Sequence, residues 1–213
     1  MAGESHVLAG PEEQVAGRLG YARDVTTAQR LRSYTYDEYL RALEASHIKL
    51  EYAEGEIYAM AGGTPAHAQL GARAIALLQT ALTKNCTVFS SDLKILVEHS
   101  DLATFPDGSV VCGPLQTSAK DKNAAINPAL LVEVTSPSTE NYDRTEKLRS
   151  YKQLAPLKVV LLVSHRARRI TVVERTDSGW SERDVRGGEV VTLATPPLRF
   201  PVDELYEGIE LTP

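Results

Sequence analysis

The spacing of hydrophobic positions predicts two helices and a hairpin in the first part of the chain. Apolar residues recur every three to four positions over residues 35–45 and again from Ala66 to about Lys84, which is the period of amphipathic helices. Thr35 and Glu38 have the spacing of a capping box at the start of the first helix. The segment IKLEYAEGEIYAM alternates apolar and polar residues on both sides of AEG, and therefore predicts a β-hairpin.

The pattern then becomes mostly strand-like. Strands are expected in CTVFSSDLKILV, TFPDGSVVCG, NPALLVEVTS and LKVVLLVS, and the third has the continuous apolar run of a central strand covered on both faces. A short polar helix from about Asn141 separates the last two, an antiparallel meander follows LKVVLLVS, and RFPVDELYEG is expected as a closing helix. This order predicts one α/β domain, a mixed β-sheet flanked by helices.

Residues 1–30 show no sustained period and are expected to be a flexible N-terminal extension, with the folded domain covering 31–213. The 213 residues, 43% hydrophobic and 24% charged, are sufficient for one domain with a sizeable core. No apolar run approaches the roughly 20 residues of a membrane helix, and no signal peptide is recognisable. We therefore expect a cytoplasmic protein with no membrane partner.

Charge and cysteine content narrow the function classes only slightly. The net charge of −5 argues against a protein that coats nucleic acid by general electrostatics, although a local basic face around a metal remains compatible with it. Cys86 and Cys112 lack the close paired spacing of a zinc site, so both are expected to be small buried hydrophobic residues.

Two carboxylates stand in apolar, β-branched segments. Asp107 begins the run FPDGSVV, and Glu133 lies in the middle of LLVEVTS. An ionised carboxylate inside a sheet costs several kcal/mol unless a cation or a metal compensates it. Two such groups on neighbouring strands can share a hard cation such as Mg²⁺, and Lys147 on the following helix could hold a phosphate or assist a water. These are the parts that phosphodiester hydrolysis needs.

Each of the three residues also has a purely structural interpretation. Asp107 lies in Pro-Asp-Gly, which is a turn signal, and Glu133 could belong to a buried ion pair. Lys147 could be the partner of Asp143, four residues earlier on a solvated helix face.

The order of these residues resembles a known family. Pro106 and Asp107 at a strand start, Glu133 on the next strand and the helix carrying DRTEK are similar to the PD-(D/E)XK nuclease superfamily, and within it to the Uma family of restriction-endonuclease-like proteins. The resemblance covers roughly residues 34–205 and rests on three segments, AEGEIYAMAGGTPAH, SSDLKILV and LLVEVTSPSTENYDRTEKLRSYKQL. It implies a magnesium-dependent endodeoxyribonuclease, a hydrolase acting on DNA, in which Mn²⁺ can substitute for Mg²⁺.

The chain departs from the superfamily pattern at Thr135, where a lysine is expected two residues after the second acid. In the Uma family the resemblance implies a lysine that has migrated to the next helix, and Lys147 is the matching position. It further implies metal binding by Asp107, Glu133 and the carbonyl of Val134. Cleavage of both strands of a duplex usually needs two active sites, so a homodimer is expected.

Three further residues are weaker candidates. The resemblance places Glu56 and His67 near the active site, where either could act on water or substrate, while Asp92 is a possible extra substrate contact. Each of them could equally be an ordinary exposed or first-turn residue. The alternative function is a catalytically inactive nuclease-fold module that binds nucleic acid or a protein partner, and a third is a scaffold whose two acids pair with Lys or Arg.

Overall fold

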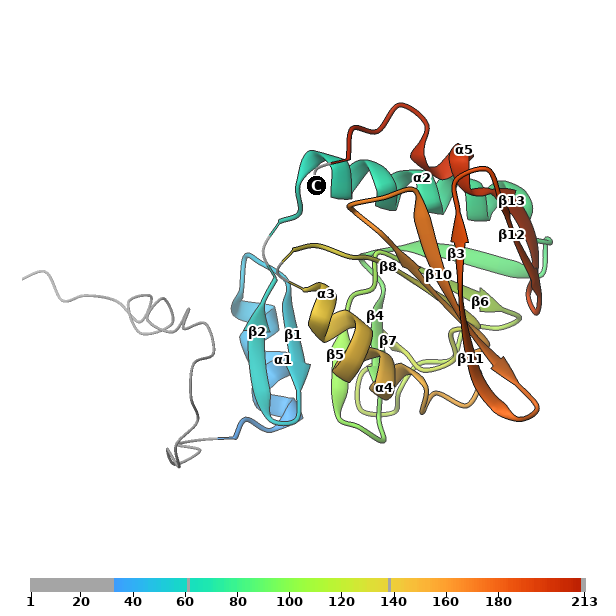
Figure 1. Ribbon diagram of the computed structural model, residues 1–213. Helices are drawn as coiled ribbons and strands as arrows, with labels where there is room; N and C mark the ends of the chain where they lie inside the picture. Colours follow the sequence, from blue (N-terminus) through green and yellow to red (C-terminus); the bar gives the residue numbers. More distant parts are fainter. Residues whose placement is uncertain (1–32, 61, 138, 212–213) are drawn as a thin grey trace, which may run out of the picture. The chain divides into compact units, whose positions relative to one another are not determined.

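The computed structural model describes residues 33–60, 62–137 and 139–211 (Figure 1). The expected N-terminal extension at 1–30 lies outside this part of the chain. Helix α1, Tyr36–Ala45, begins where the sequence predicts, and its capping box is confirmed: the Glu38 N–H donates to Thr35 Oγ1, and the Thr35 N–H donates to the Glu38 carboxylate. No helix among the described residues is both long and apolar enough to span a bilayer.

The predicted hairpin is also confirmed. Strands β1, Leu50–Ala53, and β2, Glu56–Ala59, pair antiparallel across a turn in which Glu54 and Gly55 both have positive φ, the conformation that two-residue hairpin turns favour. The hairpin belongs to a five-stranded sheet in the order β2-β1-β5-β4-β7. Its other strands are β5, Leu102–Thr104, β4, Lys94–Val97, and β7, Ala124–Ala125.

A six-stranded mixed sheet forms the centre of the domain, in the order β11-β10-β9-β8-β6-β3. Strands β8 and β9 run parallel, and every other neighbouring pair in this sheet is antiparallel. Strands β8 and β9 are buried along their whole length, as their continuous apolar runs predict. The bounds are β3, Cys86–Ser90; β6, Gly108–Cys112; β8, Leu130–Val134; β9, Val159–Val163; β10, Arg169–Thr176; and β11, Gly179–Arg186.

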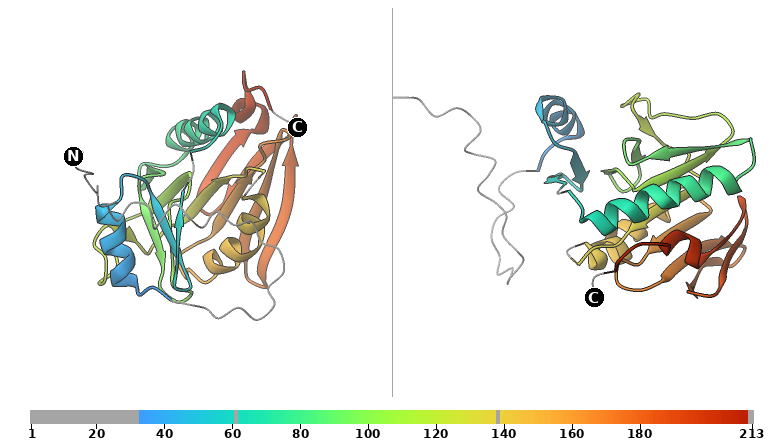
Figure 2. Two further views of the ribbon diagram at one scale, coloured as in Figure 1. Left: turned by 90° about the vertical axis from the view of Figure 1, so that its left-hand side faces the viewer. Right: turned by 90° about the horizontal axis from the view of Figure 1, so that it is seen from above.

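Helices cover both faces of this sheet (Figure 2). On one face, α2, Pro65–Ala81, packs Leu70 and Leu78 against Val132 of β8, together with α5, Val202–Tyr206. On the other, a helical segment packs Leu148 and Tyr151 in the cluster that holds Leu131 and Leu162. That segment is α3, Glu140–Tyr142, the π-helical turn η2, Asp143–Lys147, and α4, Leu148–Tyr151. The expected α/β architecture is therefore confirmed.

The structure differs from the sequence prediction in how the strands are divided. CTVFSSDLKILV is two strands, β3 and β4, which belong to different sheets because a turn at 91–93 separates them. Strands β12, Val190–Ala194, and β13, Pro197–Pro201, make a third sheet. The closing helix begins only at Val202, since the residues before it pair with β12.

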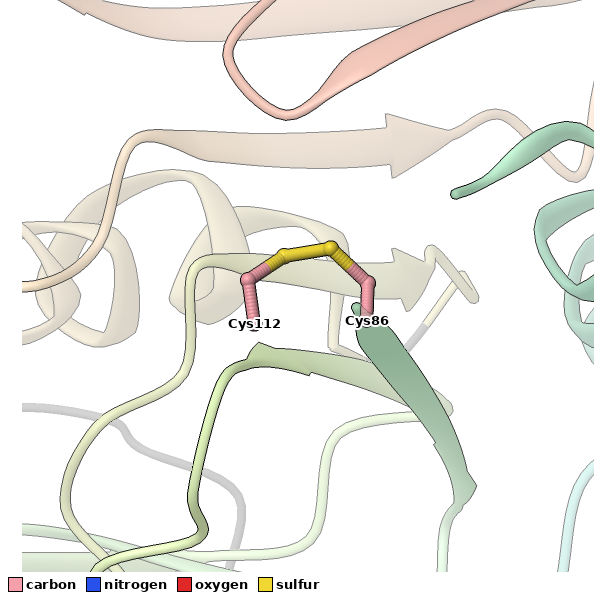
Figure 3. Close-up of a disulfide and its surroundings, with 2 residues drawn as sticks. All are labelled: Cys86 and Cys112. Carbon is pink, nitrogen blue, oxygen red and sulfur yellow. A yellow bond between two sulfur atoms is a disulfide. The ribbon is translucent and has the colours of Figure 1, made fainter. Parts of the chain in front are cut away.

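The expectation for the two cysteines was wrong. Cys86 and Cys112 form a disulfide between directly opposed positions of β3 and β6, and both are only partly buried (Figure 3). The antiparallel register brings their Cα atoms to 4.0 Å from each other. That register joins residues 26 positions apart, so local spacing carries no signal of it.

Candidate active site

Glu133 is positioned by the alternation of side chains along β8. Leu130, Val132 and Val134 face α2, so Leu131 and Glu133 face the helical segment on the opposite side of the sheet. The Glu133 side chain is almost fully buried there, where it accepts a hydrogen bond of 2.5 Å from the Tyr151 hydroxyl. Its Oε1 also lies 3.0 Å from Lys147 Nζ.

Lys147 lies at the end of the π-helical turn η2, four residues before Tyr151. Side chains four apart share a helix face, so both reach Glu133 together. Lys147 Nζ is also 3.4 Å from Glu51 Oε1 and 3.7 Å from Asp143 Oδ1. The side chain is 6% exposed, so the interpretation of Lys147 as a solvated helix residue paired with Asp143 is wrong: the pair exists, but it is buried.

Asp107 reaches the same end of the sheet from β6. Because β6 and β8 are antiparallel, the residue that precedes β6 lies beside the end of β8. Asp107 Oδ2 accepts a hydrogen bond of 2.7 Å from the Val134 N–H. His67, in the first turn of α2, places its Nε2 3.6 Å from the same oxygen. The carboxylate thus bonds across the sheet rather than only within its own turn.

Glu51 is the residue that sequence reasoning missed. It lies on β1, is 9% exposed, and accepts hydrogen bonds from the Thr104 hydroxyl and the Phe105 N–H, two residues before Asp107. Its Oε1 then contacts Lys147. Side chains alternate along β1, and Tyr52 stacks on Tyr39 of α1, so Glu51 faces the other side of the strand. The sequence pattern does not show that this other side is covered as well.

The other two residues that the sequence proposed for the site, Glu56 and Asp92, do not contact Glu133, Asp107 or Lys147 among the described residues. Glu56 is exposed on β2 and accepts a hydrogen bond of 2.8 Å from the Tyr58 hydroxyl. Asp92 precedes β4 in a turn, has a side chain that is 82% exposed, and pairs with Lys49 at 2.7 Å. We call the group formed by Glu51, Asp107, Glu133, Asp143 and Lys147 the carboxylate cluster.

The carboxylate cluster holds more negative charge than its one ammonium group neutralises. Burial, reinforced by the nearby charges of Asp143 and Asp107, raises the pKa of Glu133 from its ordinary 4.5 to about 8 despite the contact with Lys147. Burial also raises the pKa values of Asp107 and Asp143. Although burial opposes the charge on Lys147, Glu133 and its other anionic neighbours raise the pKa of the ammonium group well above its ordinary value. The site therefore favours additional positive charge.

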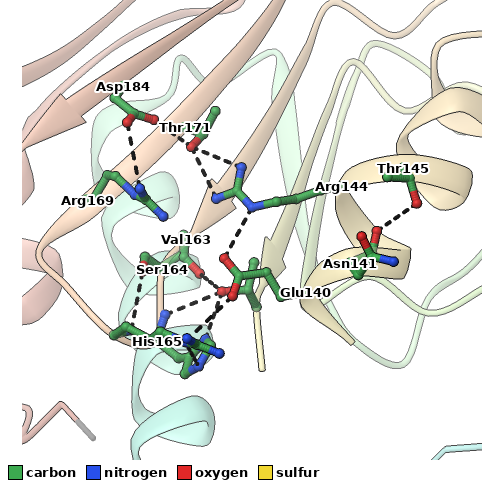
Figure 4. Close-up of polar contacts among 12 residues, drawn as sticks. Glu140, Asn141, Arg144, Thr145, Val163, Ser164, His165, Arg169, Thr171 and Asp184 are labelled. Atoms are coloured by element: carbon green, nitrogen blue, oxygen red, sulfur yellow. Dashed lines mark hydrogen bonds and ion pairs between the residues drawn. The ribbon is translucent and has the colours of Figure 1, made fainter. Parts of the chain in front are cut away.

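Thr135 occupies the position where the superfamily pattern has lysine, and it leads away from the carboxylate cluster. Its hydroxyl lies 3.0 Å from His165 Nδ1, and the Arg166 Nε–H donates to His165 Nε2 at 3.0 Å. His165 and Arg166 lie in the loop between β9 and β10. Nearby, Glu140 forms an ion pair with Arg144, whose guanidinium donates to the Thr171 hydroxyl on β10 (Figure 4). No amine comes from position 135, so Lys147 supplies the one lysine nitrogen of the cluster.

Comparison with known proteins identifies the family of this chain. The family model Uma2, described as "Putative restriction endonuclease", matches residues 36–203. This chain belongs to the Uma2 family. Two Synechocystis proteins are similar to it: slr1290 is 37% identical over 175 residues, covering 81% of this chain and 91% of its own, and sll1609 is 26% identical over 155 residues, covering 72% and 88%. Both carry the name "uncharacterized protein".

A solved structure supports the fold. A crystal structure from Anabaena variabilis, titled a putative nuclease belonging to DUF820, superposes with a TM-score of 0.66 at 17% identity and covers 82% of this chain and 98% of its own. At that identity the likeness concerns the fold alone. Together with the family match, it identifies this Uma2 protein as a nuclease-like α/β protein.

The donor chemistry of the carboxylate cluster fits a hard divalent cation. Carboxylate oxygens are the ligands that Mg²⁺ prefers, and burial, which raises the pKa values of Asp107, Glu133 and Asp143, disfavours their charged forms unless a cation compensates them. Among the described residues, no three His, Cys, Asp or Glu side chains converge as a ready-made cage. Mg²⁺ is commonly held by one or two carboxylates, with water and substrate phosphate completing its shell.

Proposed function

We propose that this Uma2 protein is a magnesium-dependent endodeoxyribonuclease that hydrolyses phosphodiester bonds in DNA. The observation that carries the proposal is the meeting of Asp107, Glu133 and Lys147 at one end of the central sheet, from three separate elements. The pKa of Asp107 and that of Glu133 are both raised by burial, which is typical of functional carboxylates. Membership in the Uma2 family supports a nucleic-acid substrate.

The roles follow from the positions of the side chains. Asp107, Glu133 and the carbonyl of Val134 would hold Mg²⁺, or Mn²⁺ in its place. When bound, the ion supplies charge neutralisation at the phosphate and a water of lowered pKa. The ammonium group of Lys147 would bind the scissile phosphate and stabilise its developing charge. Glu51, 3.4 Å from Lys147, would orient that ammonium group. His67, whose Nε2 lies 3.6 Å from Asp107 Oδ2, would orient the carboxylate of Asp107.

The test is cleavage of supercoiled, linear, single-stranded and branched DNA with Mg²⁺ or Mn²⁺. The wild type is compared with Glu133→Gln and Asp107→Asn, each of which removes one charge and preserves shape. Glu182→Gln and Asp177→Asn make the same chemical changes at exposed positions in and next to β11, and serve as matched controls. Cleavage that requires metal, survives in both controls and disappears in both cluster variants is the expected result.

The rival function is a nuclease-fold module that binds nucleic acid or a protein partner without cleaving. Thr135 in the lysine position and the ion pair between Lys147 and Glu133 favour it. Absence of cleavage of every substrate, with no Mn²⁺ binding by calorimetry, would replace our proposal with this one. For cleavage of both strands we propose a homodimer, which light scattering in solution tests directly.

A further inference from the structure

The loop that joins β9 to β10, residues 164–168 with the sequence SHRAR, lies at the same end of the sheet as the carboxylate cluster. Strands β8 and β9 are parallel, so their carboxyl ends adjoin, and the Thr135 N–H donates to the Val163 carbonyl at 2.9 Å. His165 in the loop contacts Thr135, which is two residues after Glu133. In open α/β sheets, ligands bind beyond the carboxyl ends of the strands.

Arginines outnumber acids around this loop. Five arginines take part in ion pairs there, and three acids oppose them, with Glu189 close by through the Arg186 N–H. The arginines are Arg144, Arg166, Arg168, Arg169 and Arg186, and the paired acids are Glu140, Asp184 and Asp203. Side-chain exposure is 53% for Arg166 and 54% for Arg168. This local excess contrasts with the net charge of −5 of the whole chain.

Arg166 is held in a way that leaves its outer nitrogens available. A guanidinium only donates, so His165 Nε2 is the acceptor, and Nδ1 carries the ring proton toward the Thr135 hydroxyl. Arg166 Nε is also 3.6 Å from Glu140 Oε2. Both of these contacts use Nε, and within the described part of the chain the two terminal nitrogens contact no acceptor. Each of these two nitrogens can donate to one oxygen of a phosphate group.

We propose that Arg166 and Arg168 bind backbone phosphates of duplex DNA beside the bond that the carboxylate cluster cleaves. This inference rests on the proposed function and adds to it the surface that holds the substrate. The Thr135–His165 contact gives the lysine position of the superfamily a different role here, which is to orient Arg166. Because the chain as a whole is acidic, attraction to a polyanion has to come from such a local surface.

The test uses the double variant Arg166→Gln/Arg168→Gln and measures duplex DNA binding by fluorescence anisotropy, with Ca²⁺ replacing Mg²⁺. Each lost phosphate contact lowers the slope of log K against log salt by about 0.9, so the double variant loses about 1.8. If the affinities are equal at 1 M salt, the double variant binds roughly 60-fold more weakly at 0.1 M salt, and each single variant shows about half of the change in slope. In cleavage assays KM rises while kcat at saturating DNA stays unchanged.

The matched control is Arg41→Gln/Lys122→Gln, which removes the same charge from exposed positions of α1 and of the turn before β7. If the double variant binds DNA with the slope and affinity of this control while metal-dependent cleavage persists, the binding surface is refuted and the proposed function stands. If the wild type neither binds nor cleaves DNA, both proposals fail. Circular dichroism and thermal unfolding establish that all variants are folded.

Discussion

Replacing Glu133 with glutamine separates a catalytic carboxylate from a structural ion pair. The amide preserves the shape of the side chain and can still accept from Tyr151, but it removes one negative charge from the carboxylate cluster. In the metal-free protein we expect this change to stabilise the fold at neutral and alkaline pH, because the cluster holds excess negative charge.

The magnitude follows from the pKa of Glu133. A rise from 4.5 to about 8 means that full ionisation in the folded state costs about 5 kcal/mol, at 1.36 kcal/mol for each pH unit. The folded protein holds this proton more tightly than the unfolded chain, so the contribution of Glu133 is greatest below pH 4.5 and is lost as pH rises to about 8. Between pH 5 and pH 8 the wild type should lose roughly 3 kcal/mol relative to Glu133→Gln.

The assay is urea denaturation followed by circular dichroism, in EDTA, at several values between pH 5 and pH 8. The raised pKa values of Asp107 and Asp143 act in the same direction in both proteins and largely cancel in the difference. Lys147 titrates above this window because its pKa is raised well above 10.5. Glu182→Gln, at an exposed position of β11, should follow the wild type throughout.

Two results would refute this reasoning. A difference that does not grow with pH would mean that Glu133 ionises normally in the fold. Lower stability of Glu133→Gln at pH 8 would mean that the pair with Lys147 is a net stabilising element of the structure. Added Mg²⁺ provides a second comparison: it should raise the free energy of unfolding of the wild type and have little effect on Glu133→Gln.

Three other changes probe the same cluster. Lys147→Met removes the ammonium group from among buried carboxylates, so it should abolish cleavage and destabilise the fold by about 3–5 kcal/mol at pH 8. The loss should be smaller at pH 5, where Glu133 is protonated because burial raises its pKa to about 8, and urea denaturation measures both values. Glu51→Gln should lower kcat roughly tenfold to a hundredfold with little change in DNA affinity, because the ammonium group of Lys147 is then oriented less firmly. An unchanged kcat in steady-state assays would contradict this positioning role of Glu51. Tyr151→Phe removes the hydrogen bond to Glu133 and should destabilise the fold by about 1.5–3 kcal/mol at pH 8 and by less at pH 5. Urea denaturation measures both values, and equal losses at the two pH values would exclude a hydrogen bond to the ionised carboxylate.

Local patterns in the sequence determined much of the fold. The capping box at Thr35, the alternation of β1 and β2 and the helical period of α2 each depend on neighbouring residues, and all three elements formed where the sequence predicts. The burial of Glu133 was also readable, because an uninterrupted apolar run surrounds it. These features are set by backbone periodicity and side-chain burial within a few residues.

Only the tertiary structure decided which side chains meet. Glu51 rather than Glu56 reaches Lys147, because the second face of β1 is covered by a helical segment about 90 residues later in the chain. The register of β3 with β6 pairs the two cysteines. Thr135 meets His165 because β8 and β9 lie parallel. Such contacts depend on the packing of distant elements, and the period of a single segment determines which face a residue lies on but not what will cover that face.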